Sequence, residues 1–319
     1  MRRVIGMDIH RTFWEVAIWE GGVLRHAGRV DMTRVALEGF GRTPKPTDEV
    51  VLEATGNSMA ASRVLSPFVA REVIANPLQV KAIAHAHVKT DKVDAGTLAN
   101  LYVAGYLPEV WTPDAVTERL RRLVARRYQI VRRRTRVKNE VHAILASHLV
   151  PKCLHSDLLN QRGRVWLARQ VVPADEQPAL ERNIRELDRL AEDQAELDRE
   201  IALSVMGDSP VRRLMTITSV NLTVAVGIIA AVGDVTRVKS PQKLVSYFGL
   251  NPRVRQSGLG AAHHGRISKV GRSHARAMLV EAEWGAAKRP CSFASGRSGG
   301  IRSRRSRLPV SSLSYAGIC

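Results

Sequence analysis

Four acidic side chains fall at positions from which their carboxylates could share one site. Asp8 ends the predicted strand RRVIGMD, and Glu53 ends the predicted strand EVVLE. Asp91 and Asp94 are three residues apart at the start of a predicted helix, in KTDKVDAG, so they share one helical face. Each acid alone has an ordinary explanation, because strand ends and helix starts often carry Asp or Glu, and Asp91 would serve as the helix N-cap.

Four carboxylates that converge repel one another unless cations neutralise them. Hard divalent ions such as Mg²⁺ prefer oxygen ligands, and two such ions about 4 Å apart stabilise both oxygens of a phosphoryl displacement. The four acids therefore predict a site for Mg²⁺, with two ions expected. Asp94 is the residue that a helix cap does not explain.

The charge of the chain indicates a polyanionic partner. Its 49 Lys and Arg residues against 30 Asp and Glu residues give a net charge of +19, which favours nucleic acid ahead of a membrane surface. The longest apolar run, LTVAVGIIAAVG, is too short to span a bilayer. The three cysteines are scattered and support neither a disulfide framework nor a zinc site, so we expect a reducing cytoplasm.

The elements that must position the acids lie in residues 1–112. Three successive strands, followed by alternating helices and strands, predict an α/β domain with a mixed sheet and helices on its faces. Residues 113–208 are predicted to be a helical basic and coiled-coil region, and residues 209–288 a small, mostly helical domain. In that domain NPRVRQSGLGAAHHGRISKVG is predicted to be a phosphate-facing loop.

Two patterns stand out in the helical region. Ten Arg or Lys residues fall between Arg119 and Lys138 around an apolar stripe, which indicates phosphate contact, although a solvated face is the usual explanation of such a run. Further on, Leu187, Leu190 and Leu197 belong to a coiled-coil-like spacing that fits either self-association or an intramolecular helix hairpin. The candidate nucleic-acid-binding residues are Arg121, Arg122, Arg126, Arg127, Arg132, Arg133, Arg134, Arg136 and Lys138 in the basic run and Arg253, Arg255, Arg266 and Lys269 in the predicted loop.

The segments that carry the acids resemble a known family. IGMDIH, VVLEATG and KTDKVDAGTLANL are similar to the DEDD motif of insertion-sequence transposases of the IS110 family, relatives of the Piv and MooV invertases. GLNPRVRQSG, GRISKVGRSHARAMLVEAEW and VGDVTRVKSPQKLVSYFGL resemble the second domain of that family. The resemblance implies an RNase H-like N-terminal domain of the RuvC type and a Mg²⁺-dependent transposase or site-specific recombinase that cuts and rejoins DNA.

The resemblance also assigns roles. It implies that Asp8, Glu53, Asp91 and Asp94 are the catalytic metal ligands and that Ser257, before Gly258, is a nucleophile that becomes linked to DNA. It further implies a structured noncoding RNA that guides the choice of DNA, a homo-oligomer (a dimer or tetramer) with a shared active site, and action at the bacterial nucleoid. Two alternatives stay open: a junction-resolving nuclease that uses water, and a nucleic-acid-binding protein without catalysis.

Two segments depart from the family pattern. The family has a glycine-containing turn where this chain has TSVN, and Ser219 there lacks the freedom of glycine to take a positive φ. Residues 289–319 form an irregular Ser-, Arg- and Gly-rich tail. A family-like ending can be written in a shifted reading frame of this tail, so we hypothesise a frameshift near residues 289–299 that leaves this copy inactive.

Overall fold

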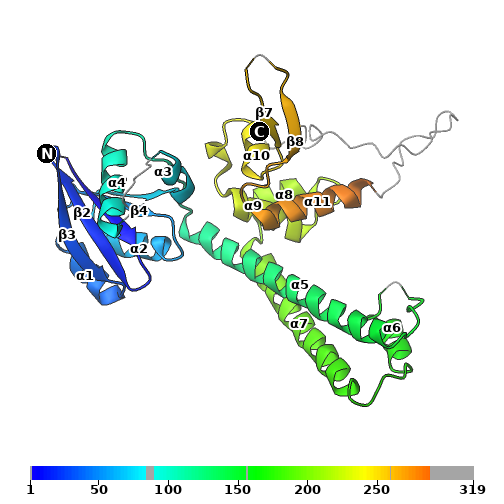
Figure 1. Cartoon of the computed structure of the whole chain (residues 1–319). Coiled ribbons are helices and arrows are strands. Elements are labelled where there is room, and N and C mark those ends of the chain that lie inside the picture. Colours follow the sequence, from blue (N-terminus) through cyan, green and yellow to red (C-terminus); the bar gives the residue numbers. More distant parts are fainter. Residues whose placement is uncertain (1, 84–89, 156, 259, 288–319) are drawn as a thin grey trace. The chain divides into compact units, whose positions relative to one another are not determined.

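The computed structural model describes residues 2–83, 90–155, 157–258 and 260–287, and it divides into two compact units at Thr112/Pro113 (Figure 1). The elements of the first unit are β1 (Arg3–Ile9), β2 (Phe13–Glu20), β3 (Val23–Asp31), α1 (Arg34–Gly41), β4 (Glu49–Glu53), α2 (Ser58–Leu65), the 3₁₀ turn η1 (Ser66–Phe68), β5 (Arg71–Ala75), α3 (Pro77–Ile83), α4 (Asp91–Val103) and β6 (Glu109–Val110).

The first unit is a mixed α/β domain, as predicted. Its strands form a sheet in the order β3-β2-β1-β4-β5-β6. The pairs β1/β2, β2/β3 and β5/β6 are antiparallel, whereas β1/β4 and β4/β5 are parallel. This arrangement is consistent with the expected RNase H-like fold, in which the first strand lies at the centre of the sheet.

Both faces of the sheet are covered, because residues of β1 and β4 alternate between two cores. Ile5, Met7 and Leu52 pack in one core with buried residues of α1 and α2. Val4 and Val51 pack in the other core with buried residues of α4. The alternation therefore decides which residues of each strand face α4.

The second unit contains the basic helix and the elements that follow it. Its elements are α5 (Ala115–Ser147), α6 (Gln161–Leu167), α7 (Gln177–Ser204), α8 (Ser209–Met215), α9 (Leu222–Val232), the 3₁₀ turn η2 (Val235–Arg237), α10 (Pro241–Tyr247), β7 (Pro252–Arg255), β8 (His263–Ile267) and α11 (Ser273–Ala287). Its division at residues 208 and 288 stays a prediction.

Helices α5 and α7 form an intramolecular hairpin, one of the two arrangements that the leucine spacing allowed (Figure 1). Two ion pairs join the helices, Arg119–Glu200 (3.1 Å) and Arg133–Glu186 (2.6 Å). The residue later in α5 pairs with the residue earlier in α7, so the helices are antiparallel. The leucine seam of α7 is buried in cores that include residues of α5. The leucine seam of α7 is therefore covered by residues of the same chain.

Two local predictions need correction. The segment expected to be a loop contains an antiparallel ribbon of β7 and β8. The strands have only four and five residues and almost all of these are exposed, so neither strand has the buried apolar face by which a sequence pattern is recognised. Thr90, and not Asp91, is the N-cap of α4: its extended backbone lets its hydroxyl accept a bond from Val93 N at 3.4 Å.

The TSVN turn between α8 and α9 keeps a left-handed conformation in spite of its serine, since Ser219 has a φ of 70°. Asn221 caps α9 and accepts a hydrogen bond from Val224 N at 3.0 Å. The tail and its frameshift hypothesis lie outside the described residues.

Candidate active site

Asp8 and Glu53 end neighbouring parallel strands on the same face of the sheet. Met7 of β1 pairs in register with Leu52 of β4, so Asp8 and Glu53 follow side by side. Met7 and Leu52 face the core beneath α1 and α2, and strand alternation therefore turns the next residue of each strand toward α4. The register therefore places the Asp8 and Glu53 side chains on the same face of the sheet, at the carboxyl ends of β1 and β4.

Gly6 allows α4 to approach β1 closely enough to reach Asp8. A Cβ atom on Gly6 would lie 2.1 Å from the carbonyl oxygen of Ala95 and 3.1 Å from the amide nitrogen of Ala99, both backbone atoms of α4. Any side chain at this position would therefore push the helix away. The absence of a Cβ sets the distance between the strand and the helix that carries Asp91 and Asp94.

Helix α4 presents its first turn toward the end of β1. Thr90 caps the helix, so Asp91 is its first residue and the Asp91 carboxylate is not needed as a cap. Asp91 Oδ1 lies 3.0 Å from His10 Nε2. Asp94 follows three residues later on the same face and is half-buried.

His10 joins the site, and the sequence analysis missed it. Its Nε2 atom lies 3.3 Å from Asp8 Oδ2 as well as close to Asp91. One ligand atom from each of Asp8, His10 and Asp91 falls within 4.8 Å of the other two. Within the described residues this set includes neither Glu53 nor Asp94, although both stand on the same face.

The electrostatics show that the acids crowd one another. The Asp8 side chain is buried, with the residue only 7% exposed, and this burial raises the pKa of Asp8 above its ordinary value. Nearby His10 opposes the rise, whereas the negative charges of Asp94 and Asp91 increase the Asp8 pKa further. Asp94 therefore acts on Asp8 even though it lies outside the tightest cluster.

This donor set fits a divalent cation. Carboxylate oxygens and an imidazole nitrogen are common metal ligands, and a cation among them would offset the burial and the neighbouring negative charges that raise the Asp8 pKa. The same arrangement without a cation leaves the buried Asp8 carboxylate close to Asp91 and under the negative charge of Asp94. The residues present thus match the metal chemistry that the acids predicted, and they leave the ion unspecified.

A second buried acid lies beside Asp8. Glu15 of β2 pairs directly with Asp8 across the antiparallel ladder and is fully buried. Arg29 contacts its Oε2 at 2.6 Å and His26 its Oε1 at 2.8 Å. The Arg29 guanidinium already supplies a charge opposite to that of Glu15, and the contacts of Glu15 with Arg29 and His26 tie β3 to β2.

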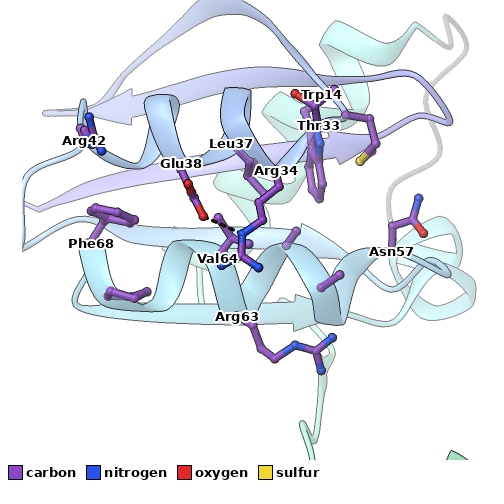
Figure 2. Close-up of a pocket in the computed structure, with 14 residues that line it drawn as sticks. Trp14, Thr33, Arg34, Leu37, Glu38, Arg42, Asn57, Arg63, Val64 and Phe68 are labelled. Atoms are coloured by element: carbon purple, nitrogen blue, oxygen red, sulfur yellow. Dashed lines mark hydrogen bonds and ion pairs between the residues drawn. The ribbon is translucent and has the colours of Figure 1, made fainter.

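The pocket between α1 and α2 lies on the other face of the sheet (Figure 2). Its volume is about 850 Å³, and Leu37, Val64 and Phe68 contribute to its apolar lining. Arg34 and Glu38, four residues apart on α1, form an ion pair of 2.7 Å beside this pocket (Figure 2). Because Leu37 packs in the core opposite α4, the pocket is separate from the acidic cluster.

The arginines of α5 differ in whether their guanidinium groups bind other residues of the protein. The Arg121 guanidinium donates to the carbonyl oxygens of Ala230 (2.7 Å) and Ala231 (2.9 Å), at the last turn of α9. Arg127 pairs with Asp198 at 2.5 Å. These two predicted nucleic-acid-binding residues therefore make contacts that hold the second unit together.

Other members of the basic run also have protein partners. Arg122 pairs with Glu118, Arg133 with Glu186 and Lys138 with Asp157, and Arg134 donates to Gln194. By contrast, Arg126, Arg132 and Arg136 are exposed on α5, and Arg132 lies over the ring of Tyr128. For Arg133 and Arg134 the sequence could not show this, because their partners Glu186 and Gln194 lie on α7, more than 50 residues later.

Ser257 lies in the connection between β7 and β8 and is exposed, as are the ribbon residues Arg253, Arg255 and Arg266. Gly258 has a φ of 58°, which explains the glycine after the serine. Arg253 donates to the carbonyl oxygen of Ser268 at 3.1 Å, across the base of the ribbon. Lys269 is also exposed and takes a left-handed φ of 57°.

Comparisons with known proteins agree with this architecture. Residues 5–150 match the model of the DEDD transposase domain of the IS110 group, described as "Transposase". Residues 211–298 match the model described as "Transposase IS116/IS110/IS902 family".

In the part of the chain that the structure describes, no helix has both the length and the apolar character needed to cross a membrane.

Two curated proteins are similar over most of the chain. The putative transposase y4qE of Sinorhizobium fredii is 27% identical over 290 residues, which cover 88% of this chain and 70% of that protein. A probable family 20 transposase of Pseudomonas aeruginosa is 27% identical over 292 residues, 86% of this chain and 81% of that protein.

The mixed sheet with acids at one edge, together with these matches, defines an enzyme that acts on DNA, a transposase. The chain belongs to the IS110 family of transposases. The match to the DEDD domain of the family runs through the first unit and α5, and the match to the second conserved domain lies in the second unit.

Proposed function

We propose that this transposase cuts and rejoins DNA strands at a divalent metal site held by Asp8, Glu53, Asp91 and Asp94. The observation that supports the proposal is the meeting of acids from β1 and the first turn of α4, where burial, and then the negative charges of Asp94 and Asp91, raise the Asp8 pKa. Mg²⁺ is the ion that we propose, two per site, because it prefers carboxylate oxygens and phosphate. When bound, the ions would stabilise the charge that develops on the scissile phosphate.

We propose Ser257 as the nucleophile of strand transfer. Its hydroxyl oxygen would bond to the scissile phosphorus while the bond from this phosphorus to the leaving oxygen of the same strand breaks. One end of the cut strand would then be linked to the serine, and the other end would carry a free hydroxyl, with the serine proton passing to the leaving oxygen. Arg255 and Arg266 lie on the same exposed ribbon, and their charges would hold the phosphate. The family resemblance supplies the role, and the exposure of the serine is compatible with it.

DNA would lie along the exposed arginines of α5 and the β7/β8 ribbon. Among the predicted contacts, Arg126, Arg132 and Arg136 are the best candidates on α5, because the structure gives them no carboxylate partner within the described residues. Arg121 and Arg127 are weaker candidates, since their guanidinium groups already bind protein atoms.

The remaining parts of the proposal rest on the family resemblance. They are a structured guide RNA, a homo-oligomer with a shared active site and a location at the bacterial nucleoid. A purified complex that contains a discrete RNA, and a defined oligomer in analytical ultracentrifugation, would support the first two. A monomer free of RNA that still excises DNA would refute both.

A second candidate function uses the same acids with water as the nucleophile, as in a junction-resolving nuclease. One observation favours it: the Asp8–His10–Asp91 cluster assembles entirely within the first unit and does not involve Ser257. The two candidates differ in what happens when the serine is removed.

Two substitutions test the proposal in an excision assay. Asp94→Asn keeps the size of the side chain and removes its charge, and Ser257→Ala removes only the hydroxyl. Each variant is expressed from a plasmid that carries the gene with its natural flanking DNA, and the excised product and any protein–DNA adduct are quantified. The transposase proposal predicts that both variants lose excision and adduct. If Ser257→Ala still cuts, water is the nucleophile; if Asp94→Asn retains wild-type excision, the metal site is refuted.

A further inference from the structure

His10 is held in a fixed position at the edge of the acidic cluster. It begins the turn between β1 and β2, where its backbone N–H donates to the carbonyl oxygen of Phe13 at 2.9 Å. Its ring stacks on the Phe13 ring, with centroids 4.7 Å apart and planes 23° from parallel. On the other side of this turn, the Arg29 guanidinium lies 4.3 Å from the centroid of the Phe13 ring, which fixes Phe13 in turn.

The Nε2 atom of His10 points into the space between two carboxylates. It is buried and has no hydrogen bond of acceptable geometry, although Asp91 Oδ1 lies at 3.0 Å and Asp8 Oδ2 at 3.3 Å. The imidazole nitrogen is thus close to both carboxylate oxygens but forms a hydrogen bond with neither. A metal ion bound by Nε2 and by both carboxylate oxygens would account for this arrangement.

The spacing of these atoms suits a metal ion. Two neighbouring ligands of an octahedral ion, each about 2.1 Å from it, lie about 3.0 Å from one another. The two distances from Nε2 to the carboxylate oxygens are close to this value. The two separations from Nε2 thus match those between neighbouring ligands of an octahedral ion, and the third pair of ligand atoms, from Asp8 and Asp91, lies within 4.8 Å.

We propose that His10 is a nitrogen ligand of the metal site, so that the site favours transition ions such as Mn²⁺ over Mg²⁺ relative to an all-carboxylate site. The inference rests on the proposed metal-dependent function and adds a ligand to it. Mg²⁺ is a hard ion that prefers oxygen, whereas first-row transition ions accept imidazole more readily. A site with oxygen from Asp8 and Asp91 and nitrogen from His10 should discriminate between the two classes of ion.

The competing explanation is that His10 is a counter-charge. A protonated imidazole between two carboxylates would neutralise them in the absence of metal and would have to leave when a cation binds. The two explanations make opposite predictions for removal of the ring. Loss of a ligand weakens metal binding, whereas loss of a competing cation strengthens it.

Pulsed electron paramagnetic resonance of the full chain with Mn²⁺ tests the proposal directly, because a coordinated imidazole nitrogen modulates the electron spin echo. We expect this nitrogen modulation in the wild type and its loss in His10→Gln. In titrations with Mn²⁺, and in competition with Mg²⁺, we expect His10→Gln to weaken Mn²⁺ binding by about 10- to 100-fold and Mg²⁺ binding less. His142→Gln, an exposed histidine of α5, is the matched control and should change neither quantity.

His10→Asp provides a second variant that keeps an oxygen ligand at this position. It should bind Mg²⁺, show no nitrogen modulation and have lost the preference for Mn²⁺. Nitrogen modulation that persists in His10→Gln, or tighter binding of both ions by that variant, would overturn the proposal.

Asp8→Asn separates this inference from the proposed function. If Asp8→Asn abolishes Mn²⁺ binding while the wild type shows no nitrogen modulation, the metal site stands and His10 is not its ligand. If the wild type binds Mn²⁺ no better than Asp8→Asn does, the proposed metal site itself fails, and the inference fails with it.

Discussion

Gly6→Ala should separate the acids of the active site without touching any of them. The new Cβ would lie 2.1 Å from Ala95 O, and ordinary contact begins near 3.4 Å. The difference, 3.4 − 2.1, requires α4 to move away from β1 by about 1.3 Å at this point. Since both atoms that the methyl group meets belong to the helix backbone, no side-chain rotation can relieve the clash.

The expected cost follows from that displacement. Overpacking of a rigid contact costs about 1–3 kcal/mol, and the upper end applies here. Replacing a strand glycine returns about 0.5–1 kcal/mol of backbone entropy. We therefore expect Gly6→Ala to lower the free energy of unfolding by about 2 kcal/mol. Moving Asp91 and Asp94 by roughly 1 Å should also reduce the rate of strand cleavage by about 100-fold.

Urea unfolding and the excision assay measure the two effects. Gly39→Ala is the matched control, because Gly39 is a helical residue of α1 around which a Cβ would meet no atom within 4 Å. It should stabilise the protein by about 0.5–1 kcal/mol and leave excision unchanged. If Gly6→Ala retains wild-type stability and cleavage, the close approach of α4 to β1 does not set the geometry of the acids.

Three further predictions concern stability and DNA binding. The raised Asp8 pKa means that the metal-free protein loses stability as the pH rises from the ordinary aspartate range through the raised value. Asp8→Asn should therefore raise the melting temperature at pH 7 in a chelator, and not at a pH below the ordinary aspartate pKa. Ser219→Gly should stabilise the chain by about 1 kcal/mol in urea unfolding, because it relieves a left-handed serine; a destabilised variant would contradict this. Arg121→Ala should cost about 2 kcal/mol, since it removes two charged hydrogen bonds to carbonyls of α9. Arg126→Ala should instead leave stability unchanged and lower the salt slope of DNA binding by about 1, and equal effects of the two arginine variants would refute the distinction.

Much of the first unit could be predicted because its signals are local. The strands around Asp8 and Glu53 are short apolar runs bounded by turn residues, and each appears close to its predicted position. The alternation of β1 and β4 then places both acids on one face, which is a consequence of strand geometry alone. The position of Asp91 and Asp94 on the first turn of a helix could be predicted from the sequence in the same way.

The missed features depend on contacts between distant segments. His10 follows Asp8 by two residues in a polar turn, and nothing in that spacing shows that α4 will bring Asp91 to its Nε2. The arginines of α5 look alike in sequence, but Arg121 meets the end of a helix more than a hundred residues later. The Thr90 cap was overlooked because threonine and aspartate are both good N-caps and stand side by side.

Calorimetric titration with Mg²⁺ tests the central claim most directly. The wild-type chain, Asp8→Asn and Asp94→Asn are titrated under the same conditions, with folding checked by circular dichroism. The account predicts that the wild type binds Mg²⁺ with a stoichiometry near two and that each substitution removes at least one of these binding events. Identical binding curves for the three proteins would contradict it.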